Sequence, residues 1–235
     1  MSRPLVSVPV GHTPRTLVVF DLDGTLVDSC RDLAESANQL VVERGGQPLS
    51  QEAVVGMVGE GAALLVQRAL TAAHLPPAVE AVARFLEIYD ARLLNHTVLY
   101  PGILEAVDAA RAAGHVAVLT NKPLHHTLRL LDGLGVRHLF ADVVGGDGEH
   151  PRKPNPQGLL ALIQTAGAEP SSTLMVGDSF VDLETAHNGG APCCLVSWGF
   201  GYPRIPRETL PAAQWIANDA AALARVIGRF AGAET

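Results

Sequence analysis

Short runs of consecutive apolar residues recur along the chain, and most of them end in polar or acidic residues. The runs are residues 17–20 (LVVF), 116–119 (VAVL), 143–144 (VV), 173–176 (TLMV) and 193–196 (CCLV). A strand that is apolar at nearly every position suits a parallel sheet that helices cover on both faces. The runs therefore predict the strands of a parallel sheet.

Segments with helical character separate these runs. Residues 103–113 read as one helix that ends at Gly114, and two more helices are expected to begin at Pro123 and Pro156, because proline is favoured in the first turn. Strands that alternate with helices in this way predict an α/β fold with a doubly wound, Rossmann-like parallel sheet.

The stretch from about residue 29 to residue 96 interrupts this alternation. Its apolar residues recur at spacings of three and four, and it contains no convincing strand. This pattern predicts an inserted bundle of about four helices, which would form a small α-helical cap over the carboxyl ends of the strands. The expected organisation is a loose N-terminal arm at residues 1–15, an α/β core at residues 16–27 and 99–235, and a helical cap at residues 28–98.

The composition narrows the classes of function. The chain has 235 residues, of which 48% are hydrophobic and 17% are charged, and its net charge is −7. This argues against disorder and leaves no basic field for nucleic acid or an anionic membrane. The three cysteines do not make a disulfide framework, and no apolar run approaches the roughly 20 residues that span a bilayer. We expect a cytoplasmic protein without nucleic-acid or membrane partners, and the sequence leaves both a monomer and a homodimer open.

Two pairs of acidic residues follow predicted strands. Asp21 and Asp23 follow the first strand, and Asp178 and Asp182 follow the strand at residues 173–176. The carboxyl ends of parallel strands form the edge where ligands bind, and carboxylates so close together need a cation or a proton between them. Hard oxygen ligands suit Mg²⁺, so the sequence predicts a magnesium site at this edge. Ser179 and Asp182 also match a capping box, so Asp182 could simply start a helix.

Polar and cationic residues follow the other predicted strands. Thr120, Asn121 and Lys153 offer a hydroxyl, an amide and an ammonium, which together can hold a phosphoryl group while charge builds up in transfer. Only two of the 17 basic residues are lysines, Lys122 and Lys153. A site that needs a compact ammonium resists replacement by a planar guanidinium. We therefore expect a phosphoryl site opposite the acids, and the role of Lys122 stays open.

Four segments resemble, in order, the four motifs of the haloacid dehalogenase-like hydrolase superfamily. They are DLDGTLVDS (residues 21–29), LTNK (119–122), RKPNP (152–156) and VGDSFVDLETAHNGG (176–190). The inserted helices resemble the superfamily's small α-helical cap. Two further segments, VGEGAALLVQRAL (58–70) and VVGGDGEHPRKPNP (143–156), are similar to bacterial phosphoglycolate phosphatases.

The resemblance implies a role for each residue of these motifs. It implies that Asp21 is a nucleophile that becomes an aspartyl phosphate, and that Asp23 is first the general acid and then the base. It implies that Mg²⁺ is held by Asp21, the backbone carbonyl of Asp23, and Asp178, with Asp182 assisting, and that Thr120, Asn121 and Lys153 hold the phosphoryl group.

These roles describe a Mg²⁺-dependent phosphomonoesterase that acts on a small phosphorylated metabolite. The resemblance favours 2-phosphoglycolate as the substrate. A sugar phosphate, an amino-sugar phosphate, pyrophosphate and a phosphoglucomutase-like reaction stay open, and a non-catalytic ligand-binding protein is a remote alternative.

The cap supplies a hypothesis about substrate choice. The turn from Gly59 to Gly61 could point the N–H groups of a helix start at a substrate carboxylate, with Arg68 two turns further along the same face. The alternative is a plain turn between helices.

Overall fold

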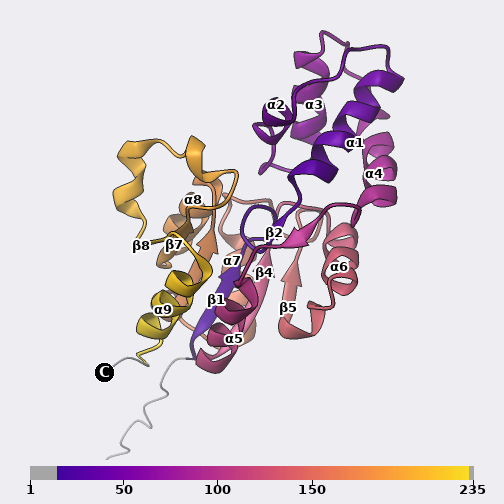
Figure 1. Cartoon of the computed structure of the whole chain (residues 1–235). Helices are drawn as coiled ribbons and strands as arrows, with labels where there is room; N and C mark the ends of the chain where they lie inside the picture. Colours follow the sequence, from indigo (N-terminus) through magenta and orange to yellow (C-terminus); the bar gives the residue numbers. More distant parts are fainter. Residues whose placement is uncertain (1–14, 233–235) are drawn as a thin grey trace, which may run out of the picture.

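A six-stranded parallel sheet forms the centre of the molecule (Figure 1). It is seen in a computed structural model that describes residues 15–232, so the expected N-terminal arm lies outside the described residues except for Arg15. The strands lie in the order β5-β4-β1-β6-β7-β8. Their bounds are β1 Leu17–Phe20, β4 His115–Leu119, β5 Asp142–Val144, β6 Thr173–Gly177, β7 Cys193–Val196 and β8 Trp215–Ala217.

Helices cover both faces of this sheet, which explains why β1 is apolar at every position. Val18 and Phe20 belong to the larger hydrophobic cluster, whereas Leu17 and Val19 belong to a second cluster on the other face. All four side chains are buried, as expected for a central strand with period-two alternation between two covered faces. The larger cluster includes α5 (Ile103–Ala113), α6 (Leu124–Gly133) and α9 (Ala220–Phe230), and the second includes α7 (Gln157–Ala166) and α8 (Phe180–Gly189). The predicted doubly wound α/β fold is confirmed.

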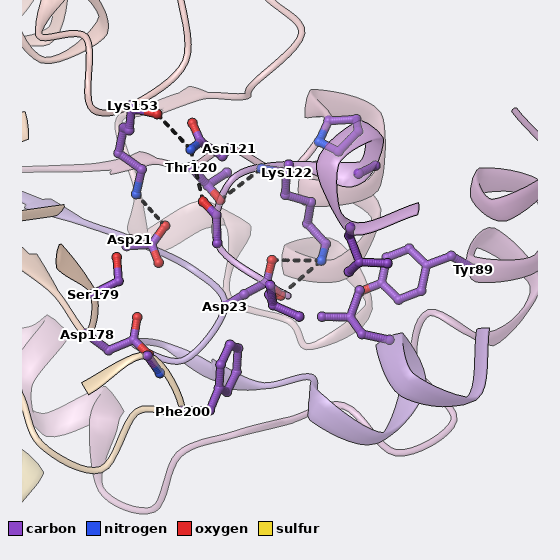
Figure 2. A pocket seen from close by; sticks show the side chains of 18 of the residues that line it. Asp21, Asp23, Tyr89, Thr120, Asn121, Lys122, Lys153, Asp178, Ser179 and Phe200 are labelled. Carbon is purple, nitrogen blue, oxygen red and sulfur yellow. Dashed lines mark hydrogen bonds and ion pairs between the residues drawn. The ribbon is translucent and has the colours of Figure 1, made fainter. Parts of the chain in front are cut away.

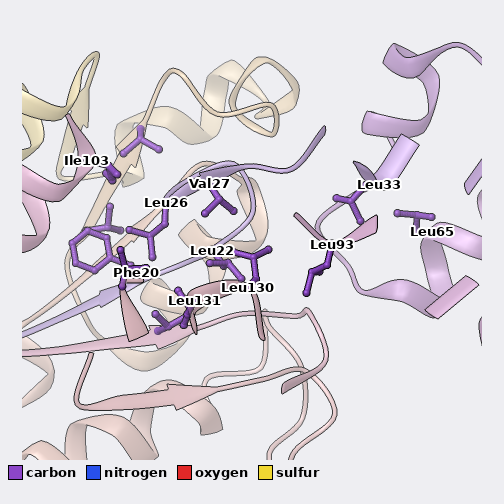
Figure 3. Close-up of a cluster of buried hydrophobic side chains, with 14 of the residues drawn as sticks. Phe20, Leu22, Leu26, Val27, Leu33, Leu65, Leu93, Ile103, Leu130 and Leu131 are labelled. Atoms are coloured by element: carbon purple, nitrogen blue, oxygen red, sulfur yellow. The ribbon is translucent and has the colours of Figure 1, made fainter. Parts of the chain in front are cut away.

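The inserted helical region is also confirmed. Four helices lie between β1 and α5, at the carboxyl end of the sheet (Figure 1). The hydrophobic cluster of the core continues into them, from Leu22 and Val27 near β1 to Leu33 and Leu65 in the cap helices (Figure 3). The cap is therefore packed against the core. Its helices are α1 Cys30–Glu43, α2 Gln51–Val55, α3 Ala62–Ala72 and α4 Ala81–Arg92.

The structure adds elements that the hydrophobic pattern does not predict. A two-stranded antiparallel ribbon, β2 (Val27–Asp28) with β3 (Val98–Leu99), stands where the chain enters and leaves the cap. The expected cap boundaries at residues 28 and 98 fall inside this ribbon. The edge strand β8 and the helix α9 after it were not predicted either. Two or three residues are too few to show alternation, so such strands leave little signal in a sequence.

No helix in the described range is both long enough and apolar enough to span a bilayer.

A buried aspartate fastens the cap at its stem. Asp32 lies in the first turn of α1 and is fully buried. Its Oδ2 accepts hydrogen bonds from the backbone N–H of His96 (2.9 Å), the backbone N–H of Thr97 (2.8 Å) and the Thr97 hydroxyl (2.8 Å). The start of the cap is thereby tied to the segment that leaves it.

We expect Asp32→Ala to lower the free energy of unfolding by about 3 kcal/mol, because it leaves buried donors without an acceptor. Urea denaturation measures this change. The matched control is Asp108→Ala on α5, whose side chain is 68% exposed, and it should cost less than about 0.5 kcal/mol. Equal effects of the two substitutions would contradict the fastening role of Asp32.

Candidate active site

Loops after four neighbouring strands meet at one cavity between the sheet and the cap. Asp21 and Asp23 follow β1, and Asp178 follows β6, while the residues after β4 and Lys153 after β5 come from the other side (Figure 2). The predicted residues that line the cavity are Asp21, Asp23, Gly59, Gly61, Thr120, Asn121, Lys122, Lys153 and Asp178. Lining side chains from the cap include Leu33, Val58, Leu65, Phe85, Leu86 and Tyr89.

Three carboxylates and one ammonium form a buried cluster at the cavity. One oxygen each of Asp21, Asp178 and Asp182 lies within 4.8 Å of the other two, and all three residues are buried. The Lys153 Nζ donates hydrogen bonds to Asp21 Oδ1 (2.7 Å) and to Asp182 Oδ1 (2.6 Å). This acidic trio has the chemistry of a site for a hard metal ion.

Two carboxyl groups of the trio have raised pKa values. Burial raises the pKa of Asp21 to about 7, although the nearby Lys153 acts in the opposite direction. Burial and the negative charges of Asp182 and Asp21 raise the pKa of Asp178 well above its ordinary value. Burial by itself would lower the pKa of Lys153, but Asp182 and Asp21 raise it above its ordinary value. Lys153 therefore stays charged, while protons and cations compete for the carboxylates.

A glycine allows the two acidic loops to approach each other. Gly24 has a φ of +90°, and a Cβ added there would lie 2.2 Å from Asp178 Oδ2. That oxygen also accepts a hydrogen bond of 2.7 Å from the backbone N–H of Gly201. A side chain at position 24 would clash with the Asp178 carboxylate and would strain the backbone, so this position requires a glycine.

Asp182 takes part both in a helix cap and in the site. Its Oδ2 accepts hydrogen bonds from the Ser179 hydroxyl (2.6 Å) and the Ser179 N–H (3.1 Å), and its N–H donates to the Ser179 hydroxyl. The capping box is thus present at the start of α8. The other oxygen of the same carboxylate accepts the bond from Lys153. The cap fixes the orientation in which Asp182 faces Lys153.

Asp23 lies apart from the trio and is held by different partners. Its Oδ1 accepts a hydrogen bond from the Ser29 hydroxyl (2.6 Å), and both of its oxygens lie 2.9 Å from Lys122 Nζ. Burial alone would lower the pKa of Lys122, but Asp23 raises it above its ordinary value. The sequence left the role of Lys122 open, and the contact of Ser29 with Asp23 was not predicted. The rarity of lysine in the chain was the one available signal for Lys122.

Asn121 joins the cap to the loop that carries Lys153. Its Nδ2 donates hydrogen bonds of 3.0 Å to the carbonyls of Gly59 and Lys153. Thr120, next to it, is buried, and its hydroxyl accepts a bond of 3.2 Å from the Lys122 N–H. Contact of Thr120 and Asn121 with a phosphoryl group stays a prediction.

The cap turn reaches the cavity, but Arg68 does not. Gly59 and Gly61 line the cavity. Gly61 has a φ of +93°, and a Cβ there would lie 3.1 Å from the Arg152 guanidinium. The Arg68 guanidinium donates instead to the Glu60 carboxylate and the Met57 carbonyl, and its side chain is 38% exposed. The structure therefore does not bring Arg68 together with the other predicted site residues.

Comparisons with known proteins agree with this geometry. Residues 16–190 match the profile of a family described as haloacid dehalogenase-like hydrolase. The chain is 43% identical over 204 residues to a phosphoglycolate phosphatase of Rhodospirillum rubrum, and the alignment covers 83% of this chain and 84% of that protein. It is 34% identical over 225 residues to a phosphoglycolate phosphatase of Haemophilus influenzae, and that alignment covers 92% of this chain and 100% of that protein.

Solved structures show the same fold. The crystal structure of a predicted phosphoglycolate phosphatase from Haemophilus somnus superposes with a TM-score of 0.83 at 33% identity, over 92% of this chain and 99% of that one. The acidic trio, the helical cap and the sequence match lead to one conclusion. The chain belongs to the haloacid dehalogenase-like hydrolases and is similar to bacterial phosphoglycolate phosphatases.

Proposed function

We propose that this enzyme is a Mg²⁺-dependent phosphomonoesterase that converts 2-phosphoglycolate to glycolate and phosphate through an aspartyl-phosphate intermediate. The observation that carries the proposal is the acidic trio with Lys153, because it places a carboxylate nucleophile beside an ammonium and beside oxygens that can hold a metal ion. The similarity to phosphoglycolate phosphatases supports the choice of substrate.

The residues present fit a magnesium ion. Asp21, Asp178 and Asp182 offer three closely spaced oxygen ligands, and the pKa values of Asp21 and Asp178 are raised, as expected where a cation is the natural counter-charge. We expect the backbone carbonyl of Asp23 to complete the protein ligands. Mg²⁺ bound there would neutralise charge on the phosphoryl oxygens.

Two side chains carry the covalent chemistry. A carboxylate oxygen of Asp21 attacks phosphorus while the bond from phosphorus to the leaving oxygen breaks, and Asp23 gives its proton to that oxygen. In the second step Asp23 takes a proton from water, which attacks phosphorus and releases Asp21 and inorganic phosphate. Thr120, Asn121 and Lys153 hold the phosphoryl group in line during both steps. The bonds from Ser29 and Lys122 support the orientation of Asp23 that this exchange needs.

The Asp21→Asn variant tests the nucleophile. We expect wild-type enzyme to release phosphate from 2-phosphoglycolate only with Mg²⁺, and the variant to lose about 1,000-fold or more in kcat. The measurement is phosphate release from a panel of small phosphate esters and pyrophosphate, with Asp108→Asn on α5 as a control that should keep full activity. A higher kcat/KM on another ester would overturn the substrate, and undiminished turnover by Asp21→Asn would overturn the mechanism.

The raised pKa of Asp21 predicts how magnesium stabilises the protein at different pH values. Below a pH of about 4 this carboxyl binds a proton in both the folded and the unfolded state, and between about 4 and 7 mainly in the folded state. The stability that this proton gives the metal-free protein is therefore lost as the pH rises through about 7.

Because Mg²⁺ must displace that proton, its stabilising effect should grow with pH. At one fixed concentration, about 100 times the dissociation constant at pH 8, we expect Mg²⁺ to raise Tm by about 5 °C at pH 8 and by much less at pH 5, where its affinity is lower. Differential scanning fluorimetry measures both shifts. Asp178→Asn should remove most of the Tm shift that Mg²⁺ causes, and the control Asp108→Asn should keep it. A Tm shift that is the same at both pH values would contradict the assignment of the acidic trio as the magnesium site.

A further inference from the structure

The two lysines of the chain face opposite sides of the cavity. Lys153 lies among the acidic trio, whereas Lys122 lies beside Asp23, under the cap (Figure 2). Among the described residues that line the cavity, these two are the only cationic side chains. The proposed phosphoryl chemistry uses Lys153 directly, whereas Lys122 enters it only through its contact with Asp23.

A tyrosine of the cap lies at the same place as Lys122. The Tyr89 ring extends from α4 toward Asp23 and Lys122 (Figure 2), and Lys122 Nζ lies 4.6 Å from the centre of that ring. Tyr89 is only 2% exposed, and its hydroxyl has no hydrogen-bond partner among the described residues. Burial raises the pKa of Tyr89 to about 12, although the nearby Lys122 acts in the opposite direction, so the hydroxyl keeps its proton at neutral pH. A buried donor left unpaired is costly, and a ligand that accepts its hydrogen bond would remove that cost.

Lys122 lies next to the side chain that would protonate the leaving group. Its Nζ is 2.9 Å from both oxygens of Asp23, and its side chain is only 4% exposed. A carboxylate on the leaving group would bring a second negative charge to this buried ammonium, where hydrogen bonds between charged groups are strong. In glycolate the carboxylate is attached to the carbon that bears the ester oxygen, so it lies close to the oxygen that Asp23 protonates.

We propose that Lys122 and Tyr89 form a carboxylate subsite, which selects phosphate esters whose leaving group carries a carboxylate next to the ester carbon. The Lys122 ammonium supplies the charge and the Tyr89 hydroxyl donates a hydrogen bond. This assignment rests on the proposed function and replaces the expected role of Arg68. The cap side of the cavity is otherwise mostly apolar, with Leu33, Leu65 and Phe85, and it offers few partners for the hydroxyls of a sugar.

The test compares two substrates that differ in the charge of one group. These are 2-phosphoglycolate and 2-phosphoglycolamide, in which a neutral amide replaces the carboxylate. Wild-type enzyme should prefer the carboxylate by its kcat/KM. The decisive variant is Tyr89→Phe, because it keeps the ring against Lys122 and removes only the hydroxyl. It should lower the ratio of the two kcat/KM values about 10-fold, mainly through a higher KM for 2-phosphoglycolate.

Lys122→Met gives the complementary result. It should lower the same ratio about 100-fold and should also reduce kcat on both substrates, because Lys122 holds Asp23. The control is Tyr202→Phe, which removes a hydroxyl from a tyrosine outside the cavity lining and should leave the ratio unchanged.

The possible failures are distinguishable. If Tyr89→Phe and Lys122→Met reduce turnover of both substrates equally, the subsite is wrong while the proposed function stands. The same holds if wild-type enzyme hydrolyses the acid and the amide equally well. If wild-type enzyme hydrolyses other esters but neither of these two, the substrate assignment and the subsite both fall.

Discussion

Buried carboxylates outnumber ammonium groups at the carboxyl edge of the sheet, and the rest of the site depends on how this imbalance is relieved. Four aspartates face Lys122 and Lys153 there, so two negative charges lack a protein partner when all six groups are ionised. The raised pKa values of Asp21 and Asp178 express this excess. A divalent cation would supply the missing charge in place of protons and would leave the carboxylate of Asp21 available for the proposed attack on phosphorus.

The fold concentrates these charges by simple topology. The strands β4, β1 and β6 are adjacent and parallel, so the residues that follow them meet at one edge although they are far apart in the sequence. Gly24 lets the first acidic loop approach Asp178 closely. The cap then covers the edge with apolar side chains and brings Tyr89 opposite Lys122. The apolar lining lowers the local dielectric on the cap side of the site, which strengthens charge interactions there.

The sequence predicts the parts of this arrangement that depend on periodicity and order along the chain. A strand buried on both faces must be apolar throughout, so β1 is visible, and the acids after it follow from the same rule. Contacts between distant side chains leave no such trace. The hydrophobic pattern of α4 places Tyr89 on the buried face of the helix. The sequence does not show that the Tyr89 hydroxyl lacks a hydrogen-bond partner there. Arg68 has a suitable helical spacing, yet Glu60 binds its guanidinium outside the cavity.

The most direct test of this account is the number of protons released when magnesium binds. Isothermal titration calorimetry in buffers of different ionisation enthalpy gives both the stoichiometry and the proton count. We predict one Mg²⁺ per chain and a proton release that increases as the pH is lowered from 8 to 6, because Mg²⁺ displaces the proton held by Asp21, whose pKa is about 7. Magnesium binding without proton release, or no binding at all, would contradict the claim that the buried carboxylates require a cation.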